Sequence, residues 1–214
     1  FTTSVVKLAI RQPLIVAKQL STLGVMLGDR VGFGIGISPW PEDFEACQVP
    51  WEKRGKRMDE MMEIINGLMS GEYFGYEGEM FNIAPVKLCP VPEHHIPLLV
   101  GGHARPALRR AARLGDGWVS AGSSLEELGE MIGQIEAFRQ DFGRVDKPFE
   151  YHAMTEAAYS VEGLADLEGA ENWLLRSDEW PLWFRGTARW DEETEGAMRG
   201  LLRGVGPRGW GVGG

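Results

Sequence analysis

The feature that most constrains this sequence is the alternation of short apolar strands with amphipathic helices along its first 160 residues. Strand patterns occupy residues 1–10, 31–37, 97–100, 117–120 and 149–160, and helical patterns occupy 13–27, 51–69, 106–114 and 125–142. The helix at 51–69 is the clearest, because Met58, Met61, Ile65 and Leu68 recur at helical spacing. Strands separated by helices pair in parallel, so the pattern predicts an α/β fold built from βαβ units.

Three irregular segments interrupt the alternation. Residues 38–50 contain Pro39 and Pro41 and are expected to form a loop. Residues 73–81 place aromatic side chains on both sides of a glycine-containing turn, which predicts a small hairpin. A proline-containing loop then leads into the strand at 97–100.

The character of the chain changes near residue 170. Five of the eight tryptophans follow that point, and the chain ends in a glycine-rich run without aliphatic strands or clear helical periodicity. We therefore divide the sequence into residues 1–170, the strand–helix domain, and residues 171–214, an off-pattern tail that we expect to be disordered or peripheral.

Composition argues against several classes of function. A net charge of −9 disfavours a non-specific nucleic-acid binder, which needs a basic surface against the phosphates. No apolar run approaches the ~18 residues of a membrane span, so no membrane partner is expected. Cys47 and Cys89 cannot build a disulfide framework, which favours a reducing cytoplasm. His94 and His95 lack a third ligand at metal spacing, so no metal site is expected.

The strongest chemical signal is the junction at residues 99–108. An apolar strand ends in Gly101 and Gly102, and Pro106 then opens a helix. Free N–H groups and the positive end of the helix dipole make such a junction suitable for phosphate, and Arg105 supplies a charged donor. A plain strand-to-helix turn is the alternative interpretation.

A second signal is the alternation of Gly32, Gly34 and Gly36 in one strand. Glycines at this spacing let a flat ligand or a neighbouring backbone approach the strand closely. The spacing of a dinucleotide fingerprint is absent, and no helix follows directly. Tight packing inside a barrel is therefore an equally good interpretation.

Several segments, taken in order, resemble one known family. They are residues 3–6, 11–18, 30–36, 51–61, 76–81, 97–102 and 111–118. In this order they are similar to segments of the luciferase-like monooxygenases over roughly residues 1–170. The resemblance implies a (β/α)8 TIM barrel with its ligand at the carboxyl ends of the strands. It is closest to the branch that uses the deazaflavin coenzyme F420, with FMN as the alternative cofactor.

The resemblance also implies a set of cofactor-binding residues. A non-prolyl cis peptide between Ser4 and Val5 would lie behind the flavin ring. Gly101, Gly102, Ala104 and Arg105 would bind the cofactor phosphate, in agreement with the junction described above. The loop after the glycine-containing strand would place Ile37 and Ser38 near the cofactor. No catalytic residue is identified.

This sequence departs from the family pattern at both ends. The first two barrel strands are missing, so the barrel is expected to be incomplete and the chain a fragment. In sugar-phosphate dehydrogenases of the family a glutamate follows the glycine-containing strand, whereas Pro39 and Trp40 stand here. After residue 170 the expected aliphatic strand is replaced by the tail, which a change of reading frame would explain.

The resemblance predicts an oxidoreductase that transfers a hydride between F420, or FMN, and a small organic substrate, with monooxygenation if FMN is used. A non-catalytic partial barrel that binds a flavin or a phosphate is the alternative. A phosphate-handling isomerase or aldolase would need a lysine or glutamate at a strand end, where only Lys7 and Glu156 are loosely placed. Open sheet edges also favour a homo-oligomer.

Overall fold

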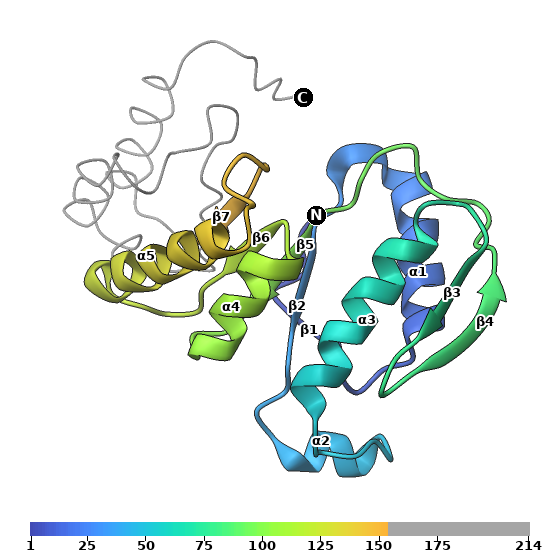
Figure 1. Ribbon diagram of the computed structural model, residues 1–214, viewed down its shortest axis with the longest axis horizontal. Coiled ribbons are helices and arrows are strands. Elements are labelled where there is room, and N and C mark those ends of the chain that lie inside the picture. The colour runs from blue at the N-terminus through green and yellow to red at the C-terminus, as the bar shows by residue number, and fades with distance from the viewer. Residues whose placement is uncertain (154–214) are drawn as a thin grey trace, which may run out of the picture.

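A computed structural model describes residues 1–153, which form one parallel sheet covered by helices (Figure 1). The strands are β1 (Val6–Lys7), β2 (Phe33–Gly36), β5 (Leu98–Gly101), β6 (Gly117–Val119) and β7 (Glu150–His152). They lie in the order β1-β2-β5-β6-β7, and each neighbouring pair is parallel. This order follows the chain, as in a (β/α)8 barrel, and confirms the predicted incomplete barrel.

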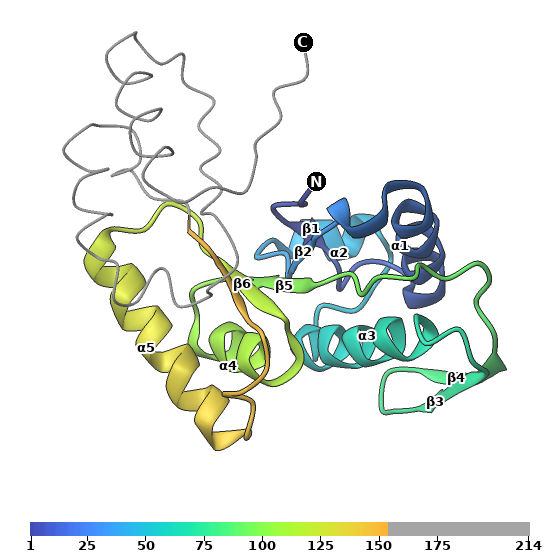
Figure 2. The ribbon, with the colours of Figure 1, turned by 90° about the horizontal axis from the view of Figure 1, so that it is seen from above.

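Four longer helices follow the strands, and neighbours in sequence contact each other. They are α1 (Pro13–Leu27), α3 (Arg54–Leu68), α4 (Arg105–Leu114) and α5 (Leu125–Asp141). Figure 2 shows α3, α4 and α5 side by side along the sheet. All four were predicted within three residues at either end, because each has a clear apolar face or an opening proline.

The hydrophobic core fills the space between the sheet and these helices. Met58, Met61, Ile65 and Leu68 of α3 are fully or almost fully buried there, as their spacing predicts. Trp118 of β6 is completely buried in the same core. Its indole Nε1 donates to the carbonyl oxygen of Gly102 at 2.9 Å, which fixes the segment after β5.

The segment after β2 differs from the predicted loop, because it contains a short helix, α2 (Pro41–Ala46). Pro41 occupies the first turn, where the missing N–H costs nothing, and Glu42 and Asp43 place negative charge at the positive end of the helix. A helix of six residues has too few positions for its periodicity to be recognised in the sequence.

The predicted hairpin is present, but its second strand lies later in the sequence than expected. The antiparallel pair consists of β3 (Phe74–Glu77) and β4 (Asn82–Val86). Elsewhere in the chain, a short 3-10 helix, η1 (Gly28–Arg30), lies between α1 and β2. The buried carboxylate of Glu60 accepts the N–H groups of Glu79, Met80 and Phe81 at 2.9–3.1 Å. These bonds fix the turn at residues 78–81, inside the range predicted for the hairpin, and no local pattern indicates them.

The glycines of β2 are packed against the first residues of the chain. A Cβ on Gly34 would overlap the carbonyl oxygen of Thr3, and one on Gly36 would lie 2.8 Å from Val5 Cγ2. Thr3 is fixed in this position by a hydrogen bond from its Oγ1 to the Gly34 carbonyl at 2.8 Å. The structure therefore supports the interpretation that these glycines allow tight packing inside the protein, and not that they make room for a flat ligand.

The predicted division of the chain at residue 170 is not tested by the structure. Three predicted features lie outside the described residues: the tail at 171–214, Glu156, and the second half of the predicted strand at 149–160. Within residues 1–153, no helix is long and apolar enough to cross a membrane.

Candidate functional site

Val5 forms a wall at the end of the sheet where the parallel strands have their carboxyl termini. The peptide bond between Ser4 and Val5 is cis, as the resemblance implied. Thr2 pairs with Gly32 and Val6 with Ile35, so one extra residue of the first strand bulges over β2. The Val5 side chain lies against two glycines: a Cβ would be 2.8 Å away at Gly36 and 2.9 Å at Gly101. Two predicted site segments, residues 4–5 and 101–102, are therefore adjacent.

Beside this wall, the segment from Gly102 to the start of α4 presents a row of backbone donors. Within residues 1–153, the N–H groups of residues 102–105 have no hydrogen-bond acceptor. Gly102 has a φ of +119°, and Ala104, the N-cap of α4, has no side-chain oxygen to cap the helix. Residues 102–105 are exposed, and unbonded N–H groups at a helix N-terminus are suited to an anion such as phosphate; we call this row of donors the cradle. A side chain at position 102 would be strained.

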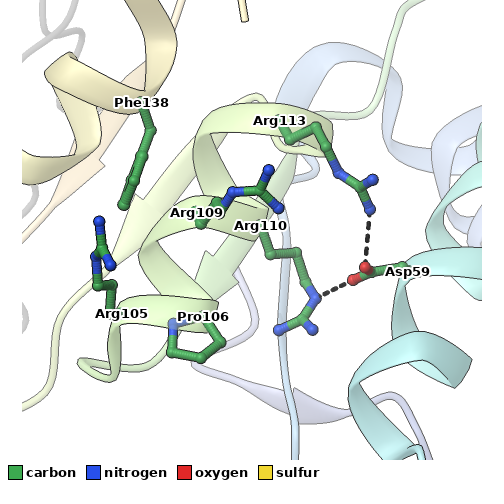
Figure 3. Close-up of a pocket in the computed structure, with 7 residues that line it drawn as sticks. All are labelled: Asp59, Arg105, Pro106, Arg109, Arg110, Arg113 and Phe138. Carbon is green, nitrogen blue, oxygen red and sulfur yellow. Dashed lines mark hydrogen bonds and ion pairs between the residues drawn. The ribbon is translucent and has the colours of Figure 1, made fainter. Parts of the chain in front are cut away.

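The side chain of Arg105 points away from this cradle. Its guanidinium lies over the ring of Phe138 on α5, 5.3 Å from the ring centroid, and faces a groove on the outer layer of helices (Figure 3). The structure therefore places its backbone N–H at the cradle and its charge in the groove.

Ile37 and Ser38 follow β2 and lie on the rim next to the wall. Ile37 is half-buried and packs toward α3, where its Cδ1 would be 4.0 Å from a Cβ on Gly55. Ser38 is buried, and its hydroxyl donates to the carboxylate of Asp43 and accepts the N–H of Trp40 at 3.3 Å. Ser38 therefore orients the start of α2.

A charged pair spans the carboxyl ends of β1 and β2. Lys7 Nζ donates to Asp43 Oδ2 at 2.5 Å and lies 4.6 Å from the ring centroid of Trp40, which is 56% exposed. The hydrogen bond from Lys7, assisted by that from Ser38, lowers the pKa of the Asp43 carboxyl below its usual value of 3.8. The rim thus carries an ionised carboxylate, an ammonium group and an exposed indole.

The model of one protein family matches most of the chain. The family is described as luciferase-like monooxygenase, and its model matches residues 1–166. The chain belongs to this family. The resemblance found in the individual segments is thereby confirmed.

Relatives of this luciferase-like chain use two kinds of cofactor. An uncharacterized protein of Mycobacterium tuberculosis is 47% identical over 168 residues, which cover 78% of this chain and 58% of the relative. An F420-dependent glucose-6-phosphate dehydrogenase of Microbacterium testaceum is 31% identical and covers 54% of this chain and 35% of the relative. An FMNH2-dependent dimethylsulfone monooxygenase of Pseudomonas putida is 28% identical, with coverage of 58% and 36%.

A solved structure supports the fold. The coenzyme F420 dependent tetrahydromethanopterin reductase of Methanopyrus kandleri superposes with a TM-score of 0.62 at 19% identity, covering 72% of this chain and 49% of the reductase. The luciferase-like chain thus spans little more than half the length of the Mycobacterium protein and less of the other relatives named here.

Sequence reasoning missed the pair of Lys7 and Asp43. The sequence points to Lys7 only as the lysine that an isomerase or aldolase would need, and it does not single out Asp43. The signal was nevertheless available: one residue ends β1, the other follows β2, and the carboxyl ends of neighbouring parallel strands meet at one edge. Among residues 1–153, no three potential metal-ligating side chains lie together.

Proposed function

We propose that this luciferase-like chain is part of an oxidoreductase that binds coenzyme F420 and transfers a hydride between it and a small organic substrate. The observation that carries the proposal is the row of unbonded N–H groups at residues 102–105 beside the cis Ser4–Val5 wall. The backbone cradle suits the phosphate that both F420 and FMN contain.

The described residues fit such a cofactor in two ways. The glycine at position 102, with its φ of +119°, leaves the backbone donors uncovered. Val5 presents an apolar surface next to Gly101, 38% exposed, against which a flat ring can pack. When bound, the deazaflavin supplies the carbon that accepts or gives the hydride, whereas FMN in its place would supply reactivity toward oxygen.

The protein's own part is to bind and orient. Residues 102–105 would hold the phosphate, and Val5 would fix one side of the ring. The ammonium of Lys7, held by Asp43, faces the rim where a substrate oxygen would enter, and Trp40 offers an apolar contact beside it. The F420-dependent dehydrogenase relative, at 31% identity, supports F420 over FMN.

We further propose a cytoplasmic location, a small-molecule substrate rather than nucleic acid or a membrane, and a homo-oligomer.

Cofactor titration tests the proposal. The protein is titrated with F420 and with FMN while the fluorescence of each cofactor is followed, and the Gly102→Ala variant is titrated in parallel. We expect F420 to bind more tightly than FMN and the variant to bind about tenfold less tightly, because the added Cβ strains the cradle. Tighter binding of FMN would assign the chain to the flavin branch, and binding of neither would refute the proposal.

Turnover distinguishes the enzyme from a partial barrel that only binds. The protein is mixed with reduced F420 and a panel of small carbonyl compounds, and with oxidised F420 and a panel of alcohols. Oxidation or reduction of F420, followed by its absorbance, would support the oxidoreductase. Tight binding with no change of redox state on either panel would favour the non-catalytic alternative.

A further inference from the structure

The outer layer of helices contains a groove that the proposed reaction does not use. It has a volume of about 550 Å³ and is lined by side chains of α3, α4 and α5 (Figure 3). Four of its seven lining residues are arginines of α4 at helical spacing, so they share one face of that helix. They are Arg105, Arg109, Arg110 and Arg113.

The groove has an excess of positive charge. Among the described residues that line it, Asp59 of α3 is the single acidic one, so four cations and one anion give these residues a net charge of +3. Both oxygens of Asp59 are engaged: Oδ1 accepts Nε of Arg110, and Oδ2 accepts Nη2 of Arg113 at 2.8 Å. The whole chain has a net charge of −9, so this patch runs against the charge of the molecule.

Sharing one carboxylate leaves Arg110 incompletely neutralised. Its side chain is only 7% exposed, and its remaining contact is to the neutral carbonyl of Gly55 at 3.1 Å. Removing a guanidinium from water costs free energy unless opposite charge compensates for it. An anion in the groove would supply that compensation.

The other two arginines are held ready for a ligand. Arg105 lies over Phe138 and Arg109 over Phe142, with guanidinium carbons 5.3 and 5.0 Å from the ring centroids. Neither has a carboxylate partner among residues 1–153. Stacking uses the flat face of a guanidinium and leaves its N–H edge open, which is the edge that binds a phosphate or carboxylate.

We propose that this groove is a second binding site, specific for a small, multiply charged phosphate or carboxylate. Its volume matches small-molecule sites. Arginine forks bind both kinds of anion through paired charge-assisted hydrogen bonds. The site is distinct from the cradle at residues 102–105, because Arg109, Arg110 and Arg113 follow the first turn of α4 on its outer face.

Calorimetric titration of the whole chain with pyrophosphate and with citrate tests this proposal. The two probes distinguish a phosphate from a carboxylate ligand. Arg109→Gln should weaken binding of the preferred probe about tenfold or more, the loss expected for a charge-assisted hydrogen bond. Arg109→Lys keeps the charge without the fork and should fall between that variant and the parent protein. Within residues 1–153 the exposed Arg109 side chain contacts only the ring of Phe142, so both variants should fold.

Two control variants locate the bound probe. Arg30→Gln removes an exposed arginine outside the groove and should leave the affinity unchanged. Gly102→Ala weakens any binding of pyrophosphate to the cofactor cradle, so the binding that remains in this variant reports the groove and should have the affinity that the groove has in the parent protein. A loss of binding in Gly102→Ala but not in Arg109→Gln would place the probe in the cradle and overturn the groove site, while leaving the proposed function intact. Failure of both probes to bind at millimolar concentration would overturn it as well.

Discussion

Strand β2 and the end of β5 both place glycine against Val5 of the first segment, but the space that glycine leaves is used in opposite ways. On β2 the space is filled by the protein itself, since Thr3 and Val5 lie directly over Gly34 and Gly36. On β5 only Gly101 is covered, by Val5, and the backbone beyond it is open, with four donors lacking an acceptor within residues 1–153. Glycine spacing alone therefore does not distinguish packing from ligand binding; the hydrogen bonds of the following residues do.

The largest expected effect lies on β2. Gly34→Ala places a Cβ on the carbonyl oxygen of Thr3, and because that contact is with backbone, relief requires moving the first strand. We expect a loss of about 3 kcal/mol in the free energy of unfolding, the upper range for overpacking. Chemical denaturation measures it.

A glycine of α5 provides the matched control. A Cβ at Gly133 meets nothing within 4 Å, so Gly133→Ala should stabilise the helix by about 0.5–1 kcal/mol. If Gly34→Ala unfolded at the same denaturant concentration as the parent protein, the packing role of the β2 glycines would be refuted.

The second effect lies at Gly102, directly after β5, and separates stability from binding. Gly102→Ala should cost about 1–2 kcal/mol, because a φ of +119° is strained for alanine, and it should also weaken cofactor binding. Gly143→Ala at the end of α5 is the matched control: its φ is +62°, and no atom lies within 4 Å of the added Cβ. It should lose stability but keep its cofactor affinity. Equal affinities in the two variants would argue against a cradle at residues 102–105.

Much of this contrast was predictable from sequence, and the reasons differ by residue. The strand-to-helix junction at Gly101 and Gly102 and the buried face of α3 are local patterns, so turn chemistry and periodicity predicted them. The pairing of Lys7 with Asp43 and the sharing of Asp59 by two arginines join residues far apart in the chain. Only the packed arrangement of strands and helices brings such groups together.

The third effect concerns the rim that closes the end of β1 and β2. Asp43→Asn removes the partner of Lys7, whereas Glu42→Gln on the same helix is the control. Hydrogen bonds from Lys7 and Ser38 lower the pKa of Asp43 in the folded protein. The ionised Asp43 carboxylate therefore stabilises the fold at any pH above its unfolded pKa of 3.8, and this stabilisation is lost as the pH falls through the folded pKa. Denaturation of parent and variant over a pH series should show a difference that is constant near neutrality and shrinks in acid. A constant difference at all pH values would contradict this assignment.

The smallest effect is expected at the opposite end of β5. His95 Nε2 lies 2.9 Å from Asp116 Oδ2, which also accepts the N–H of Leu98 and so fixes the start of the strand. The hydrogen bond with Asp116 raises the pKa of His95 above its usual 6.5. Because the pKa of His95 is raised in the folded protein, the stabilisation that His95 contributes is fully present below pH 6.5 and is lost as the pH rises through its folded pKa. Because the imidazole is 64% exposed, we expect His95→Gln to cost only a few tenths of a kcal/mol in acid and nothing at alkaline pH. His94→Gln is the matched control for the loss of an imidazole from the same loop. A cost that grew toward alkaline pH would show that neutral His95 donates its Nε2–H to the Asp116 carboxylate, and that the imidazolium is not needed to hold the start of β5.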